Sequence, residues 1–327
     1  MSTRAVRFYD EHPSPATLRD EVLQGLGAHP KRIAPKFFYD ERGSRLFDAI
    51  CELPEYYPTR TEMAILRGCA PEIRQLAGPN CMLIELGSGA SRKIRLLLET
   101  LRPRRYLGID ISREFLLESV ERLAQDYPWL EVHAACADFS RNLDLPDCHG
   151  TERKLAFFPG STIGNFEPYE ALAFLQHIRR LLQPDGALLV GVDLKKDPQI
   201  LHRAYNDNQG VTAAFNLNLL ERLRSELGAK LDPRVFRHRA FYNAKAGRIE
   251  MHLVSQHAQE ICIDGRRFRF KAGESIHSEN SYKYSVAEFH ALARRAALQP
   301  VRVWLDPERL FSVHYLSVAA ACPPYIL

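Results

Sequence analysis

The sequence predicts an α/β protein built on a Rossmann-like, mostly parallel sheet, and three observations lead to this fold class. Residues 81–110 (CMLIELGSGASRKIRLLLETLRPRRYLGID) contain an apolar run, a glycine turn, a helical apolar repeat and a second apolar run, which together predict a βαβ unit. Further short apolar runs alternate with amphipathic segments as far as residue 194. Two final strand-like runs, joined by a turn at Asp306-Pro307, fit an antiparallel sheet edge.

The individual elements follow from the spacing of apolar residues between turn-forming Gly, Pro and Asp. Short apolar runs predict seven strands, at residues 82–86, 106–109, 130–137, 155–158, 187–194, 300–305 and 311–320. Apolar residues at helical spacing predict helices at residues 15–26, 61–76, 94–101, 113–125, 169–182 and 286–297. Because strands and helices alternate, the central part should be a doubly wound sheet.

Two segments are surplus to this sheet. Residues 8–60 are dense in aromatic and charged side chains. Residues 196–285 form an insertion with predicted helices at 198–205 and 211–227 and predicted strands at 235–242, 248–256 and 260–270. Neither segment is expected to form a core alone, so we expect the two to pack together. The predicted organisation is a sheet domain, 61–195 plus 286–327, and an α+β substrate-recognition domain, 8–60 plus 196–285.

The glycine turn and the acid that follows it predict a nucleoside site. Gly87 and Gly89 allow a ligand to approach the backbone closely, and Asp110 can accept hydrogen bonds from two ribose hydroxyls. A dinucleotide fingerprint needs a third small residue where this chain has Arg92, so the spacing fits S-adenosylmethionine better. A lone Gly-x-Gly is equally consistent with an ordinary strand-to-helix turn, and the surrounding motifs must decide.

Composition narrows the class of protein. The formal charge of +4 is spread along 327 residues without a basic stripe, so we expect no nucleic-acid partner. No apolar signal segment or run long enough to span a membrane is present, and seven scattered cysteines lack a Cys-x-x-Cys pair. These features favour a cytoplasmic, monomeric enzyme of a small-molecule substrate, with no membrane association and no metal.

Two further motifs lie at predicted strand ends, where ligands bind in open α/β sheets. Asp138-Phe139 follows the third strand and suits an adenine, with the carboxylate on the exocyclic amine and the ring on the base, although such an aspartate is more often a turn former. The loop at residues 159–166 follows the fourth strand and should face the reacting methyl group. The Leu-x-Pro-x-Gly-x-Leu order at residues 182–188 is common in methyltransferases.

Several separated motifs agree with one family. They are FFYDERGSRLFDAICELPEYYPTRTE, ELGSGASRKIRLLL, GID, ADF, FFPGSTIGNF, AYNDNQGVTAAFNLNLL, RIEMHLVSQ and GESIHSENSYKYS. Over almost the whole chain they resemble the histidine-specific Nα-methyltransferase family of ergothioneine biosynthesis. The resemblance implies a class I S-adenosylmethionine-dependent methyltransferase fold with a seven-stranded sheet and a second, substrate-binding domain.

The resemblance also implies roles for individual residues. The methyl donor should contact Gly87, Lys93, Asp110, Asp138 and Phe139. The amino-acid pocket should consist of Tyr39, Tyr56, Asn165, Tyr205, Glu279 and Ser281. In that pocket Asn165 and Tyr205 would hold the substrate carboxylate, Glu279 and Ser281 the imidazole nitrogens, and Tyr56 would lie beside the ring. Tyr39 would lie near the amine. The two catalytic candidates are Tyr39, for this position, and Asn165, which would hold the carboxylate next to the reacting amine.

The implied activity is α-N-methylation of free L-histidine by S-adenosylmethionine, with three transfers giving the trimethylated betaine, hercynine. Asn280 and Tyr282 flank the imidazole-binding pair and leave the ring specificity open. The alternative is therefore an α-N-methyltransferase of another aromatic amino acid, such as a tryptophan derivative. Two other classes fit less well: a nucleic-acid methyltransferase, which lacks its basic stripe here, and a non-catalytic cofactor-binding module, which would need no amino-acid pocket.

Overall fold

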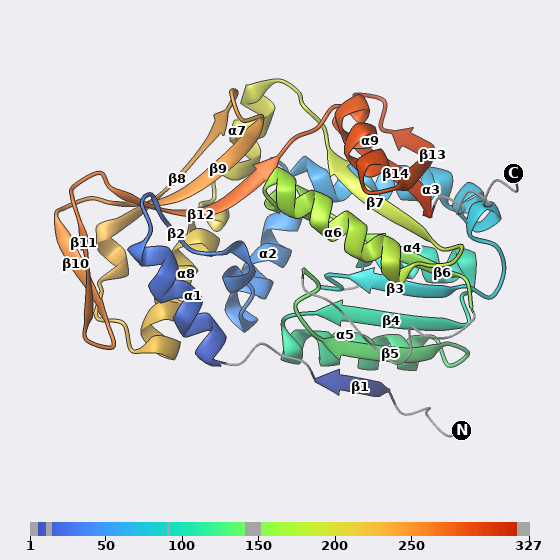
Figure 1. The fold of residues 1–327 in the computed structure, drawn as a ribbon, viewed down its shortest axis with the longest axis horizontal. Coiled ribbons are helices and arrows are strands. Elements are labelled where there is room, and N and C mark those ends of the chain that lie inside the picture. Colours follow the sequence, from blue (N-terminus) through green and yellow to red (C-terminus); the bar gives the residue numbers. More distant parts are fainter. Residues whose placement is uncertain (1–5, 11–14, 90–91, 141–151, 319–327) are drawn as a thin grey trace, which may run out of the picture.

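The computed structural model describes residues 6–10, 15–89, 92–140 and 152–318. Figure 1 shows two parts side by side, a large sheet flanked by helices and a smaller group of sheets and helices built from the two surplus segments. The glycine-turn residues Ala90 and Ser91, and the last two residues of the strand predicted at 311–320, lie outside the described residues.

The large sheet has eight strands in the order β1-β5-β4-β3-β6-β7-β14-β13. Neighbouring strands are parallel, except that β14 is antiparallel to both β7 and β13. The bounds are β1 (Arg7–Asp10), β3 (Met82–Leu86), β4 (Arg105–Asp110), β5 (Glu131–Cys136), β6 (Lys154–Phe158), β7 (Ala187–Asp193), β13 (Leu298–Leu305) and β14 (Phe311–Val318). The predicted class I methyltransferase sheet is confirmed, and β1 adds one strand to the predicted seven.

Helices cover both faces of this sheet, and each face has its own apolar core. On one face lie α3 (Tyr57–Ala77), α4 (Arg92–Leu101) and α5 (Arg113–Asp126), whose buried residues share a cluster with Leu83 and Tyr106. On the other face lie α6 (Pro168–Leu181) and α9 (Val286–Arg295), which pack with Ile84 and Leu107. Successive strand residues point to opposite faces, so a strand such as β3 is buried throughout and contributes to both cores.

The second part is a four-stranded sheet, ordered β2-β12-β9-β8, with a separate hairpin and four helices. Buried residues from Leu18 to Tyr57 and from Leu201 to Ile276 form one shared core here. The bounds are α1 (Pro15–Gly27), β2 (Lys31–Arg32), α2 (Glu41–Cys51), α7 (Pro198–Tyr205), α8 (Val211–Leu227), β8 (Phe236–Asn243), β9 (Arg248–Ser255), β10 (Gln259–Ile263), β11 (Arg266–Phe270) and β12 (Ser275–Tyr282). The exact domain boundaries remain a prediction.

The structure departs from the predicted elements in several places, and β2 and β12 lie where no strand was predicted. The strand predicted at 260–270 is a hairpin, because Asp264 and Gly265 adopt positive φ values of 49° and 75° that reverse the chain. Residues 7–10, which the prediction left outside the sheet, pair with β5 at its edge. Helix α2 was not predicted, although Asp40 caps it by accepting from the Gly43 N–H. None of the described helices is long and apolar enough to cross a bilayer.

Candidate active site

A large cavity opens at the carboxyl ends of β3, β4 and β5, where the glycine turn lies. Gly87 and Gly89 have φ values of 76° and 44°, in the left-handed region that glycine tolerates best. The Gly87 N–H donates to the Ile109 carbonyl at 2.8 Å, which ties the turn to β4. The cavity is lined by all five predicted cofactor contacts, Gly87, Lys93, Asp110, Asp138 and Phe139.

Asp110 has the geometry expected of a ribose ligand. Its Oδ2 accepts from the Gly89 N–H at 3.0 Å and its Oδ1 from the Ser112 N–H at 2.9 Å, which orients the carboxylate at the tip of β4. A carboxylate has about four acceptor sites, so each oxygen keeps capacity for a hydroxyl of a bound nucleoside. Burial raises the pKa of Asp110, and the hydrogen bonds from Ser112 and Gly89 counteract that shift.

Two of the predicted cofactor contacts already form ion pairs within the protein. Asp138 accepts from Ser140 and, at 3.1 Å, from the Lys36 ammonium. Burial alone would raise the pKa of Asp138, but the hydrogen bond from Ser140 and the charge of Lys36 hold it below its usual range. Lys93 lies 2.5 Å from a carboxylate oxygen of Glu62. Any adenine amine on Asp138 would therefore share that carboxylate with Lys36.

A second, smaller cavity collects all six predicted amino-acid ligands. Tyr39 follows the short helix at residues 35–38, Tyr56 precedes α3, and Tyr205 is the last residue of α7. Asn165 ends the short helix at residues 162–165, and Glu279 and Ser281 lie on β12. Three separate parts of the chain thus contribute to one cavity, whose lining includes Tyr39, Tyr56, Asn165, Tyr205, Glu279 and Ser281.

A β-bulge between His277 and Glu279 directs Glu279 into this cavity. Ile276 and Ser278 are buried on the inner face of β12, and strict alternation would place Glu279 on the opposite face. The bulge resets the alternation, so Glu279 and Ser281 both line the cavity. Glu279 and Ser281 are two residues apart, so both side chains point to one side of β12, and the bulge determines which side that is.

The loop at residues 159–166 separates the two cavities and lines both. Gly160 and Ser161 have φ values of 75° and 58°, and the Gly160 N–H donates to buried Glu62 at 2.9 Å. Because Glu62 also holds Lys93, this carboxylate links the loop to the helix that follows the glycine turn. The residues that line both cavities are Tyr39, Phe47, Tyr56, Gly160, Thr162 and Asn165. A group in the smaller cavity can therefore reach a group in the larger one.

Burial controls the protonation of the pocket side chains. It raises the pKa values of Tyr39 and Tyr56 well above the ordinary tyrosine value, so both phenols are neutral at physiological pH. Burial also raises the pKa of Glu279 to about 7, although the charge of Lys283 and a hydrogen bond from Asn165 lower it. A pKa near 7 means that a bound ligand can shift Glu279 between its protonated and deprotonated forms.

Comparison with known proteins shows the family to which this chain belongs. A family model described as "Histidine-specific methyltransferase, SAM-dependent" matches residues 18–318. The chain belongs to this methyltransferase family. The matched region includes the glycine turn, the loop at residues 159–166 and all six predicted amino-acid ligands. It therefore contains the residues of both cavities.

Individual relatives of this methyltransferase carry related names. "Histidine N-alpha-methyltransferase" of Mycolicibacterium smegmatis is 42% identical, with 89% of this chain aligned to 91% of that protein. The protein of the same name from Mycobacterium tuberculosis is 39% identical over 98% of this chain and 100% of its own length. "Ergothioneine biosynthesis protein 1" of Neurospora crassa is 32% identical over 84% of this chain, which covers 32% of that longer protein.

The structure adds residues to the methyltransferase site that sequence reasoning missed. Glu85, at the end of β3, lines the large cavity, and burial raises its pKa to about 8 despite a hydrogen bond from Tyr106. Phe47 of α2 packs edge-on against Tyr39 and Tyr56, with ring centroids 5.8 and 6.3 Å apart. The sequence does mark Glu85, because it is an acid inside the apolar run MLIEL. Phe47 could not be placed in the same way, because it lies on α2, a helix that was not predicted.

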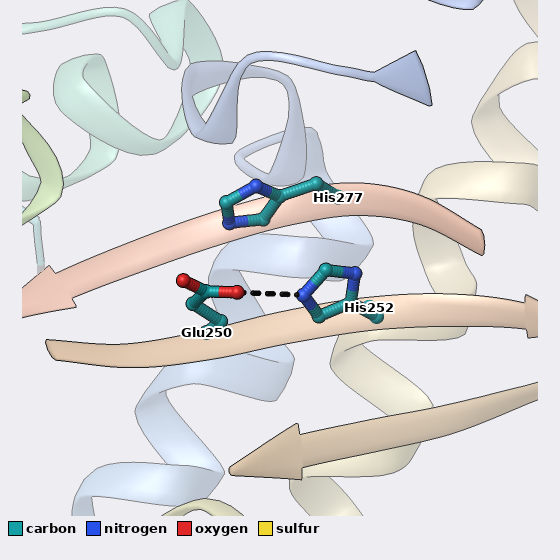
Figure 2. Close-up of side chains that lie close together, drawn as sticks. All are labelled: Glu250, His252 and His277. Carbon is teal, nitrogen blue, oxygen red and sulfur yellow. Dashed lines mark hydrogen bonds and ion pairs between the residues drawn. The ribbon is translucent and has the colours of Figure 1, made fainter. Parts of the chain in front are cut away.

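Glu250, His252 and His277 form the one group of three potential metal ligands found in the described part of the methyltransferase. Figure 2 shows them on one face of β9 and β12. The Glu250 carboxylate is held by Arg248 and Asn243. The two imidazoles stack with ring centroids 4.6 Å apart and ring planes 14° apart. His277 Nε2 lies 3.0 Å from the Glu279 carbonyl, and these contacts indicate support for the bulge.

Glu279→Gln should show how much the burial of the Glu279 carboxylate lowers the free energy of unfolding. The pKa of Glu279 is about 7 in the folded state and 4.5 in the unfolded state, so its proton stabilises the folded protein. This stabilisation is fully present below pH 4.5 and is lost as the pH rises through 7. Glutamine stays neutral at every pH. Between pH 5 and pH 8 the free energy of unfolding of the ligand-free variant should therefore rise by roughly 2 kcal/mol relative to that of the parent. Urea unfolding of both proteins at the two pH values measures this change, and a pH-independent difference would contradict it.

Proposed function

We propose that this protein transfers methyl groups from S-adenosylmethionine to the α-amine of free L-histidine. Three successive transfers would give Nα,Nα,Nα-trimethylhistidine, or hercynine, the first step of ergothioneine-type biosynthesis. The observation that carries the proposal is the convergence of six polar and aromatic side chains on a cavity that meets the glycine-turn cavity. The family description and the names of the mycobacterial and Neurospora relatives support the same substrate and pathway.

Each group of histidine has a matching partner in the pocket. The amide of Asn165 and the hydroxyl of Tyr205 donate to the substrate carboxylate. Glu279 accepts from one imidazole N–H, Ser281 faces the other ring nitrogen, and Tyr56 lies beside the ring. This arrangement directs the α-amine towards Tyr39 and Gly160, which are among the residues shared with the larger cavity.

The residues act chiefly by positioning the amine. S-adenosylmethionine, when bound, supplies an electrophilic methyl carbon, and Asp110 and the glycine turn would hold its nucleoside. The attacking amine must be neutral, and the neutral phenol of Tyr39 can accept a hydrogen bond from its N–H. Orientation of this kind contributes up to roughly 7 to 11 kcal/mol in well-positioned reactions, so no strong base is required. The aromatic faces of Tyr39 and Phe47 suit the cationic product.

The alternative substrate, a tryptophan derivative, is less supported. An indole has one N–H and no second ring nitrogen, so either Glu279 or Ser281 would have no partner on the ring. An unpaired buried polar group lowers affinity. The relatives that are 39 and 42% identical are both named for histidine. We also propose that the enzyme works as a monomer in the cytoplasm, which sedimentation and cell fractionation would check.

Mass spectrometry tests the activity directly. The protein is incubated with S-adenosylmethionine and a panel of free amino acids that includes histidine, tryptophan and a prenylated tryptophan. We expect mono-, di- and trimethylated histidine in succession, with fragmentation placing every methyl group on the α-nitrogen. Preferential methylation of a tryptophan derivative, or methylation of the imidazole, would contradict the proposal.

A further inference from the structure

A buried cluster of charges lies against the candidate histidine pocket. It consists of Asp193, Lys196 and Lys283, whose side chains are 1, 5 and 1% exposed. Asp193 ends β7, and its two oxygens lie 2.6 Å from the Lys283 ammonium and 2.5 Å from the Lys196 ammonium. The Tyr57 hydroxyl donates to the same carboxylate at 2.7 Å. Two ammonium groups thus share one carboxylate, and the cluster carries a net positive charge.

Lys283 connects this charge to two predicted substrate ligands. Its ammonium lies 2.7 Å from Ser281 Oγ and 3.3 Å from the Tyr205 hydroxyl, besides its contact with Asp193. An ammonium only donates, so both hydroxyl oxygens accept from Lys283. In the ligand-free protein the Tyr205 hydroxyl donates to Ser281 Oγ at 2.8 Å. A bound carboxylate can take this Tyr205 proton instead, because Ser281 Oγ keeps Lys283 as a donor, and the adjacent cation strengthens the new hydrogen bond.

Charge distribution in the cavity points to the substrate group involved. Among the described residues that line the smaller cavity, Lys283 is the only cation, while Asp193 and Glu279 are the acids. A substrate carboxylate therefore finds positive charge only on the side of Tyr205 and Ser281. Lys196 contacts Asp193, Tyr57 and the Leu194 carbonyl but is not part of the cavity lining.

We propose that Lys283 is a specificity-determining positioning residue that makes this enzyme select amino acids over the corresponding amines. It acts through the Tyr205 hydroxyl, which it holds as a charge-assisted donor to the substrate carboxylate. This inference rests on the proposed histidine pocket and adds the source of its carboxylate selectivity. Histamine, which has the imidazole and the amine but no carboxylate, is the matched ligand that isolates the effect.

Calorimetry with histidine and histamine, both in the presence of S-adenosylhomocysteine, tests the role of Lys283. In the parent protein histidine should bind more tightly than histamine. Lys283→Met should weaken histidine binding about 10- to 30-fold and leave histamine binding within about twofold, so most of the discrimination disappears. Lys196→Met is the matched control, because it removes a cation from the same carboxylate without touching either hydroxyl, and its discrimination should equal that of the parent.

The outcomes separate this inference from the proposed function. If the parent protein binds no histidine, the proposed function fails. If the parent discriminates and Lys283→Met discriminates equally well, or if both lysine variants lose discrimination alike, the role of Lys283 is overturned. Should Lys283→Met not fold, as judged by S-adenosylhomocysteine binding, Tyr205→Phe carries the test. It keeps Lys283 and the cavity shape, and the ratio of histidine to histamine affinity should fall about tenfold; an unchanged ratio would overturn the relay.

Discussion

Glu279→Ala should weaken histidine binding by about 1.5 to 3 kcal/mol, or about 10- to 150-fold, and leave the affinity for S-adenosylhomocysteine unchanged. Glu279 lines the smaller cavity but not the larger one, so its loss should affect one ligand only. The expected loss is that of a charge-assisted hydrogen bond between the carboxylate and an imidazole N–H. Calorimetric titration of each ligand measures both affinities.

Glu226→Ala is the matched control for this experiment. Glu226 lies near the end of α8 in the same part of the protein, pairs with Arg222, and has a side chain that is 39% exposed. Its removal should change neither affinity. Unaltered histidine binding in Glu279→Ala would contradict the assignment of Glu279, and an equal loss for both ligands would indicate a general disturbance of the fold.

Asp110→Ala should raise the dissociation constant of the donor by about 30-fold or more, because two hydrogen bonds to ribose hydroxyls are lost together. The Gly89 N–H also loses its acceptor, so the glycine turn would no longer be held in place. Equilibrium binding of S-adenosylhomocysteine measures the effect. An effect confined to histidine would overturn the ribose role.

Asp126→Ala provides the comparison for Asp110. Asp126 ends α5 in the same sheet part, pairs with Arg95, and is 52% exposed. Exposed ion pairs of this kind contribute little to stability, so the variant should bind the donor normally. A similar loss in both variants would show that the measurement reports general destabilisation instead of a cofactor contact.

The parts of the site that depend on local sequence could be predicted. Gly87 and Gly89 mark a turn after an apolar run, and Asp110 ends the next strand, so chain order alone brings them together at one sheet edge. Glu279 and Ser281 are two residues apart, so an extended segment predicts a shared direction for them, and both line the smaller cavity. The assembly of the six amino-acid ligands, in contrast, was implied by family resemblance and not by spacing.

The remaining features depend on contacts between distant segments. Lys36 reaches Asp138 from 102 residues away, and Glu62 joins Lys93 to the Gly160 loop from separate elements. No local pattern around Lys283 distinguishes it from a surface lysine, because its burial depends on β7 supplying Asp193. The bulge in β12 likewise arises from pairing with β9 and not from residues 275–282 alone.

A crystal structure with S-adenosylhomocysteine and histidine tests the central claim most directly. We expect the α-nitrogen of histidine to face the donor sulfur across the Gly160 loop, with the imidazole at Glu279 and Ser281 and the carboxylate at Asn165 and Tyr205. Histidine bound with its imidazole nearest the sulfur, or outside the cavity formed by these residues, would contradict it.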